Sequence, residues 1–191
     1  MLVLASASPR RQELLRTAGI SFTVQPANID ETPLANEPPR DYAERLAREK
    51  ALAVSPSQSN SFVLGADTIV VIDDQILGKP CDANDAACML RLLSGRTHAV
   101  ITGICLIPPV GHSPTLALKT SSEMTHVTMN EISDAEIRAY IATGEPMDKA
   151  GAYAIQGAAS RWIPRIEGDY SNVVGLPVAL VYKMLREIGA L

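Results

Sequence analysis

The chain has 191 residues, of which 47% are hydrophobic, 20% charged and 4% aromatic, and its formal net charge is −4. These values are ordinary for one soluble globular domain, and they exclude a disordered or fibrous chain. The acidic balance and the few aromatic side chains exclude a broad nucleic-acid-binding surface, and no apolar run approaches the roughly 20 residues of a membrane span.

The chain begins with a short apolar run, residues 1–5, that predicts a strand followed at once by a helix. Ser8 is a good N-cap residue and Pro9 suits the first helical position. The helix should therefore start at this point and end near Gly19.

Two cations lie in the first turn of this predicted helix. Arg10 and Arg11 oppose the helix dipole there by about 0.3–1 kcal/mol each. A phosphate held by free N–H groups, both arginines and the hydroxyls of Ser6 and Ser8 would turn that penalty into a gain. The turn therefore indicates a phosphate site; the alternative is that both arginines simply point to solvent.

A polar, Pro-rich segment, residues 28–40, predicts a loop, and a helix follows over residues 41–54. Apolar side chains recur in this helix at helical spacing, and Lys50 falls on the same stripe. We therefore expect Lys50 to face inward. The alternative is that its four-carbon stem carries the ammonium group to water.

Residues 62–72 predict a strong strand with one charge inside it, Asp67. An unpaired buried carboxylate costs several kcal/mol, so Asp67 needs either partners or a chemical role. Gly65 beside it permits close approach of another backbone or of a ligand. Asp67 could instead end a shorter strand as a turn residue, but Asp73-Asp74 makes a better turn.

Lys79 follows in an exposed turn, fixed between Gly78 and Pro80. The later segments predict, in order, a helix capped by Asp82 and running through Leu93, a strand at 100–107, a turn at 108–114, one or two strands in 115–129, a helix from the capping box of Ser133 and Glu136 to Gly144, and a final helix over 176–188. Between the last two helices, a Gly-rich segment places Asp148, Lys149, Tyr153 and Gln156 on loop or strand ends, where they can line a pocket.

Three cysteines, Cys81, Cys88 and Cys105, show no C-x-x-C spacing, and together with the three histidines they form no zinc pattern. We expect them to be reduced and mostly packed, in a cytoplasmic protein. The N-terminal apolar stretch is followed by its arginines, which is the reverse of the order in a signal peptide.

Seven segments, taken together and in this order, closely resemble the Maf family of nucleoside triphosphate pyrophosphatases: ASASPRR, NIDETP, RLAREKA, LGADTIV, GKP, DKAGAYAIQG and NVVGLP. The resemblance covers residues 5 to 177. It implies an α/β fold in which a mixed, curved sheet and flanking helices surround a central cleft. We expect a single domain over residues 1–191, with room for two lobes. The resemblance also implies a divalent cation, Mg²⁺, Mn²⁺ or Co²⁺, and a homodimer.

The resemblance further assigns roles to individual side chains. The phosphate-binding residues of the family match Ser6, Ser8, Arg10, Arg11, Lys50 and Lys79. Its general base matches Asp67, and Glu31 matches a carboxylate that positions metal or water. A divalent cation would sit at these two carboxylates and bridge them to phosphate oxygens. The branch of the family that acts on dTTP and UTP matches at Arg10, Thr68 and Gln156.

The function implied is that of a hydrolase of nucleotide metabolism, which converts dTTP and UTP to the nucleoside monophosphate and diphosphate (pyrophosphate). An alternative is a nucleotide-binding regulator of cell division or septum formation without essential turnover. A pure phosphate receptor gains nothing from a carboxylate close to a polyanion, so Asp67 favours the enzyme. A third alternative is another phosphotransfer enzyme, acting for example on phosphosugars, which base selectivity would exclude.

Overall fold

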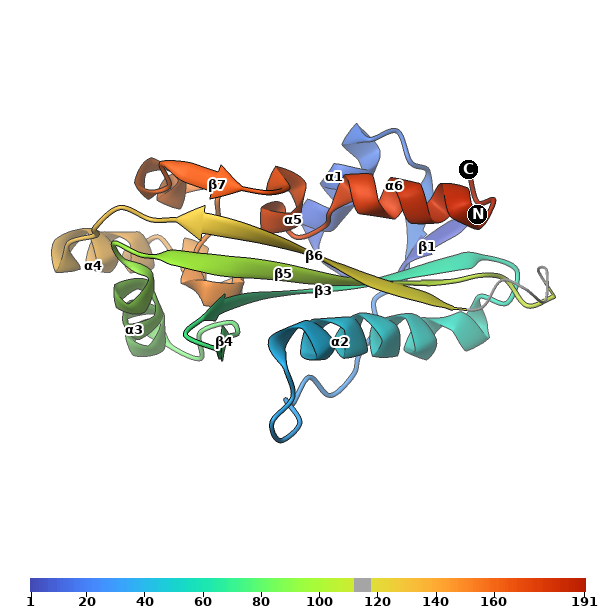
Figure 1. Cartoon of the computed structure of the whole chain (residues 1–191), viewed down its shortest axis with the longest axis horizontal. Helices are drawn as coiled ribbons and strands as arrows, with labels where there is room; N and C mark the ends of the chain where they lie inside the picture. Colours follow the sequence, from blue (N-terminus) through green and yellow to red (C-terminus); the bar gives the residue numbers. More distant parts are fainter. Residues whose placement is uncertain (112–117) are drawn as a thin grey trace.

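The computed structural model describes residues 1–111 and 118–191, which form a long mixed sheet flanked by helices (Figure 1). The order of the hydrogen-bonded strands is β2-β1-β3-β5-β6-β7, and β4 pairs with the end of β3. Their bounds are β1 Leu2–Leu4, β2 Phe22–Val24, β3 Phe62–Ile72, β4 Gln75–Leu77, β5 Thr97–Ile107, β6 Lys119–Thr128 and β7 Arg165–Glu167. Strand β1 is parallel to β2 and β3, and the other pairs are antiparallel.

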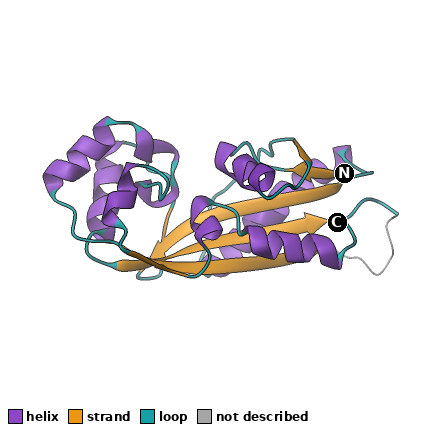
Figure 2. Cartoon of the chain, turned by 90° about the horizontal axis from the view of Figure 1, so that it is seen from above, coloured by secondary structure: helices purple, strands orange, loops and turns teal. Residues whose placement is uncertain are grey.

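Helices cover both faces of the sheet and gather in two groups along it (Figure 2). One face packs against α2 (Pro39–Val54), and the other face carries α1 (Pro9–Thr17), α5 (Tyr170–Val174) and α6 (Val178–Glu187). These four helices form the first group, and η1 (Ser55–Ser57) follows α2. The second group contains α3 (Ala83–Leu93), α4 (Asp134–Ala142) and the 3₁₀ helices η2 (Glu145–Asp148), η3 (Ala150–Ala152) and η4 (Ala158–Trp162). The α/β class with a mixed sheet is thereby confirmed. In the part of the chain that the structure describes, no helix is both long and apolar enough to cross a membrane.

The local start signals in the sequence are confirmed. Ser8, Asp82 and Ser133 cap α1, α3 and α4 with their side chains, and the capping box of α4 is complete. The Asp73-Asp74 turn adopts φ values of 50° and 60°, the left-handed geometry of a two-residue hairpin.

Several boundaries and environments differ from the prediction. Helix α2 begins at Pro39, where proline suits the first turn, and β5 begins at Thr97 because β6 continues to pair with it. Strand β7 and helix α5 are too short to leave a periodic pattern. The predicted turn at 108–114 and the start of the predicted strand region at 115 lie partly outside the described residues. All three cysteines are free, as expected. The expectation that they are mostly buried is correct only for Cys105, since Cys81 and Cys88 are exposed.

The backbone of helix α2 lies against the sheet at two glycines of the sheet. A Cβ atom on Gly65 would lie 2.0 Å from the carbonyl oxygen of Ala47, and one on Gly103 would lie 2.2 Å from that of Ala43. Gly65 therefore admits another backbone, which was one of its two predicted uses. The close packing brings Lys50, on α2, beside Asp67, on β3.

Candidate active site

A cavity of about 420 Å³ opens where the start of α1, the middle of β3 and the segment before η4 meet. Its volume lies in the usual range for small-molecule sites. All the side chains selected from the sequence line it: Ser6, Ser8, Arg10, Arg11, Glu31, Lys50, Asp67, Thr68, Lys79 and Gln156. The structure thus brings the ten residues together, while their chemical roles stay predictions.

Asp67 and Glu31 meet at one ammonium group. Lys50 Nζ donates to Asp67 Oδ1 at 2.5 Å and lies 2.6 Å from Glu31 Oε1. The Lys50 side chain is only 11% exposed, so it faces inward as predicted and does not extend to water. Asp67 lies within the β3 ladder opposite Gly103, which excludes the alternative that it is a turn residue.

The surroundings shift the pKa values of Asp67 and Glu31 in opposite directions. Burial raises the pKa of Asp67, and the charges of Lys50 and Arg11 offset only part of that effect. Burial also works to raise the pKa of Glu31, but the hydrogen bond and charge of Lys50, helped by Lys79, outweigh it and lower that pKa. A carboxylate with a raised pKa is the better general base near neutral pH, so Asp67 suits this role more than Glu31 does.

Glu31 and Asp67 are the residues of the cavity that would hold a divalent cation, because carboxylate oxygens are the ligands that Mg²⁺ prefers. Glu31 and Asp67 offer hard oxygen ligands, and both carboxylates contact Lys50 Nζ. Among the described residues, no three or more His, Cys, Asp or Glu side chains cluster where they could hold a metal ion. An ion here would take its other ligands from phosphate and water, as Mg²⁺ does when one or two carboxylates bind it.

Arg11 is buried, at 8% exposure, and most of its donors point at the protein. Its Nε donates to the carbonyl oxygen of Gly175 at 2.8 Å, and Nη1 donates to the carbonyl oxygen of Ala66 at 2.8 Å and to Ser6 Oγ at 3.0 Å. Its Nη2 donates to Thr68 Oγ1 at 3.0 Å. The solvent alternative is therefore wrong for Arg11, which joins α1 to β3 and to the turn after α5.

The remaining polar groups give this end of the cavity its donors. Ser6 Oγ accepts from Arg11 and from the N–H of Ser8 at 3.3 Å, and neither bond uses its own hydroxyl proton. Arg10 is half-buried and Lys79 is exposed in its turn, and both line the cavity. These groups are available to a polyanion in the way that the sequence predicts.

Thr68 is held by a hydrogen-bonded group of side chains beneath the cavity floor. Its Oγ1 lies 2.9 Å from Thr102 Oγ1 and 3.2 Å from the carbonyl oxygen of Gly175, besides accepting from Arg11. Thr102 in turn donates to the carbonyl oxygen of the fully buried Asn172. These hydrogen bonds fix the orientation of the Thr68 side chain, which lines the cavity.

Gln156 is exposed at the cavity wall on a segment built of short 3₁₀ turns, not at a strand end as one of the two predicted placements had it. Glu145 holds this segment: its Oε1 accepts from Tyr140 Oη at 2.8 Å and from the N–H of Ala158 at 3.2 Å. A Cβ atom on Gly157 would lie 1.9 Å from Glu145 Oε1, so a larger residue there would displace the Glu145 carboxylate. Neither Glu145 nor Tyr140 stands out in the sequence, because their contacts depend on how the turn folds.

Tyr153 lines the cavity, and its hydroxyl is hydrogen-bonded to a buried histidine, His98. Its Oη is 2.8 Å from His98 Nε2, and His98, on β5, is 2% exposed. Burial, with the nearby His126 as a smaller cause, lowers the pKa of His98 from 6.5 to about 4. His98 is therefore neutral in the folded protein at pH values where the unfolded chain already binds a proton.

This difference predicts a pH-dependent stability. Above pH 6.5 the imidazole of His98 is neutral in both the folded and the unfolded protein. Between about pH 6.5 and 4 only the unfolded chain binds a proton at this residue. The free energy of unfolding should therefore decrease by about 1.4 kcal/mol for each unit by which the pH is lowered through this range. Urea unfolding at several pH values checks this against His98→Gln, which cannot titrate and should show a shallower slope. Equal slopes in the two proteins would contradict the prediction.

Three comparisons with known proteins each cover nearly the whole chain. The family described as Maf-like protein matches residues 1–188. A dTTP/UTP pyrophosphatase of Koribacter versatilis is 58% identical over 190 residues, covering 100% of this chain and 95% of that protein. A dTTP/UTP pyrophosphatase of Geobacter sp. strain M21 is 51% identical over 190 residues, covering 100% and 96%. The solved structure of the Staphylococcus aureus Ham1 protein aligns with 97% of this chain and 98% of its own, with a TM-score of 0.47 and 12% identity.

Proposed function

This chain belongs to the Maf-like protein family, and on that premise we propose that it hydrolyses dTTP and UTP to the nucleoside monophosphate and pyrophosphate. One observation carries the proposal beyond the names of the relatives: the buried Asp67 carboxylate shares Lys50 with Glu31 inside a cavity that cationic side chains also line. Carboxylates near a polyanion weaken plain binding, so this arrangement supports turnover over the role of a non-catalytic regulator.

The reaction can be assigned to groups on the cavity wall. Lys50 engages Oδ1 of Asp67, so Oδ2 is the oxygen that would take a proton from water. The activated water attacks the α-phosphorus in line with the leaving pyrophosphate, and no covalent intermediate with the protein is required. Arg10, Lys79 and the Ser6 hydroxyl stabilise the negative charge that develops on the phosphates.

We propose in addition that a divalent cation, Mg²⁺, Mn²⁺ or Co²⁺, takes part. Glu31 and Asp67 would hold it, since their carboxylates meet at Lys50 inside the cavity. When bound, such an ion supplies charge neutralisation at the phosphate oxygens. The chain itself orients the two carboxylates and keeps the general base in place.

A homodimer and a cytoplasmic location are also proposed, from the family resemblance. A reducing compartment suits the three free cysteines, two of which, Cys81 and Cys88, are exposed.

The proposed function is tested by kcat/KM for dTTP, UTP, ATP, GTP and 7-methyl-GTP with each of the three metal ions. We expect dTTP and UTP to be cleaved best, with monophosphate and pyrophosphate released in equal amounts. Binding of all five nucleotides without turnover would support the regulator instead. Cleavage of phosphosugars without base preference would support another phosphotransfer enzyme.

Gln156 should contribute to the choice of base. Its amide can match the donor and acceptor pair on a thymine or uracil edge, and Gln156→Glu keeps the shape but removes the N–H donors. Since one lost hydrogen bond leaves a polar group unpaired at a cost of about 1–3 kcal/mol, pyrimidine turnover should fall roughly tenfold to a hundredfold, and purine turnover less. Equal losses in kcat/KM on every substrate would mean that Gln156 supports the loop and does not read the base.

A further inference from the structure

Glu31 is carried by a loop, residues 25–38, that has no helix or strand of its own. Its side chain is 50% exposed, yet its carboxylate meets the buried Lys50. A loop residue reaches such a defined position only when something fixes its backbone, because free loop residues keep many conformations. Here the backbone is fixed by side chains of helix α2.

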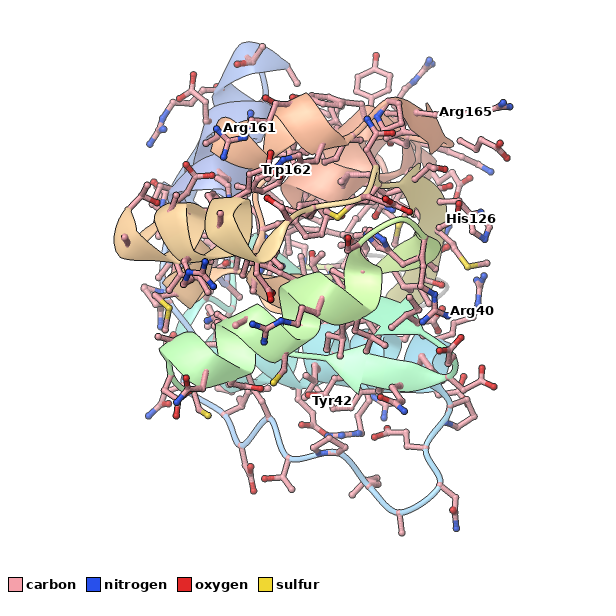
Figure 3. The ribbon with its side chains drawn as sticks, turned by 90° about the vertical axis from the view of Figure 1, so that its left-hand side faces the viewer. Arg40, Tyr42, His126, Arg161, Trp162 and Arg165 are labelled. Atoms are coloured by element: carbon pink, nitrogen blue, oxygen red, sulfur yellow. The ribbon has the colours of Figure 1, made fainter. Side chains whose placement is uncertain are left out.

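Two side chains of α2 bind successive carbonyl groups of the loop, those of Glu31 and Thr32. Tyr42 Oη donates to the carbonyl oxygen of Glu31 at 2.7 Å, and Arg45 Nη2 donates to the carbonyl oxygen of Thr32 at 3.2 Å. Figure 3 shows Tyr42 next to this loop, which hangs below the sheet in that view. Tyr42 is 7% exposed, so its hydroxyl has a fixed place from which to donate.

Arg45 is itself held rigidly. Its Nε and Nη2 make a two-pronged ion pair with Glu37 Oε1 and Oε2, at 2.6 and 2.8 Å, and Nη1 lies 3.2 Å from Glu49 Oε1. The side chains of Arg45 and Glu37 are only 13% and 9% exposed. The guanidinium also lies over the Tyr42 ring, with Cζ 5.4 Å from its centroid. Paired charges in this geometry give more rigidity than ordinary surface pairs.

The second carboxylate oxygen of Glu37 closes the loop on itself. Glu37 Oε2 accepts from the N–H of Leu34 at 3.1 Å as well as from Arg45. The loop is therefore attached to α2 at Glu31, at Thr32 and at Glu37, and the same helix carries Lys50. One helix thus sets the positions of both partners of the Glu31–Lys50 pair.

We propose that Arg45 and Tyr42 are positioning residues for the hydrolysis: they fix the backbone around Glu31 so that its carboxylate stays beside Asp67. The inference rests on the proposed function of this cavity. Arg45 does not line the cavity, and Tyr42 lines it but donates its hydroxyl proton to the backbone of Glu31, so each acts through Glu31. Displacing a catalytic group by about 1 Å can cost roughly a hundredfold in rate, which makes such a clamp kinetically important.

The test compares Arg45→Met, which keeps an unbranched apolar side chain but removes every donor, with Arg48→Met on the exposed face of the same helix. Arg45→Met should lower kcat about 10- to 100-fold with KM for dTTP changed less than about threefold, while Arg48→Met should leave both unchanged. Tyr42→Phe, which removes one hydroxyl, should lower kcat about three- to tenfold and remains informative should Arg45→Met fail to fold.

Amide hydrogen exchange supplies a readout that does not depend on activity. Exchange in residues 28–38 should quicken in Arg45→Met and in Tyr42→Phe, and stay unchanged in Arg48→Met. Unchanged exchange in both Arg45→Met and Tyr42→Phe would overturn the inference that these residues fix the backbone around Glu31. This outcome can be read whether or not the protein cleaves dTTP or UTP. Absence of turnover in the wild type would count against the proposed function alone.

A double-variant cycle decides whether the clamp acts through Glu31. In a Glu31→Gln background, Arg45→Met should cause almost no further loss in kcat, because the carboxylate that it positions is already gone. Losses that multiply, so that Arg45→Met costs the same factor with and without Glu31, would overturn the inference.

Discussion

Asp67→Asn should lose about 10²- to 10⁴-fold in kcat for dTTP, the effect of removing a general base. The amide has nearly the shape of the carboxylate but cannot take a proton from water. Lys50 keeps Glu31 as a charged partner, so the fold should survive. Nucleotide affinity should hold or increase, because a negative charge is removed from the neighbourhood of a polyanion. Steady-state kinetics and calorimetric titration with dTTP measure the two effects separately.

Asp73→Asn is the matched control, since Asp73 undergoes the same chemical change in an exposed turn at the end of the same strand. It should keep wild-type turnover. Full activity in Asp67→Asn would remove Asp67 from the mechanism. Lost nucleotide binding with an intact fold would identify Asp67 as a metal ligand instead of the base.

Arg11→Met should lower the free energy of unfolding by about 3–5 kcal/mol, in addition to any effect on nucleotide binding. The change leaves the buried carbonyl oxygen of Ala66 without its donor, and an unsatisfied group of this kind costs about 1–3 kcal/mol. The carbonyl oxygen of Gly175 loses its shorter bond and keeps only that from Thr68 Oγ1. It also removes the donor that Thr68 accepts from. The sequence predicts a phosphate ligand here, whereas the structure adds a role in holding α1 to the sheet.

Urea unfolding of Arg11→Met beside Arg16→Met measures this effect. Arg16 lies on the same helix with its side chain 56% exposed, so its loss should change stability by less than about 0.5 kcal/mol. Wild-type stability in Arg11→Met together with weaker dTTP binding would show that Arg11 serves the phosphates alone.

Features set by local sequence could be predicted from the chain. The bounds of β3 agree with prediction at both ends because a mostly apolar run begins at Phe62 and stops at a two-residue turn. The start of α1 follows from Ser8 and Pro9. The inward direction of Lys50 follows from its place on an apolar stripe. The family resemblance then selected ten side chains that line one cavity.

Features that depend on distant contacts could not be predicted. Arg11 donates to Gly175, 164 residues further along the chain, so its burial leaves no local signal. Arg45 lies off the apolar stripe of α2 and looks like a solvated surface cation until the loop folds over it. Thr102 and Asn172 support Thr68 only because β5 and α5 meet beside β3.

The central claim is that water attacks the α-phosphorus of a nucleoside triphosphate in this cavity. Hydrolysis of dTTP in water labelled with heavy oxygen, followed by mass analysis of both products, tests it most directly. The account predicts one labelled oxygen in the nucleoside monophosphate and none in the pyrophosphate. Label in the pyrophosphate, or labelled orthophosphate as the product, would place the attack on another phosphorus and contradict the account.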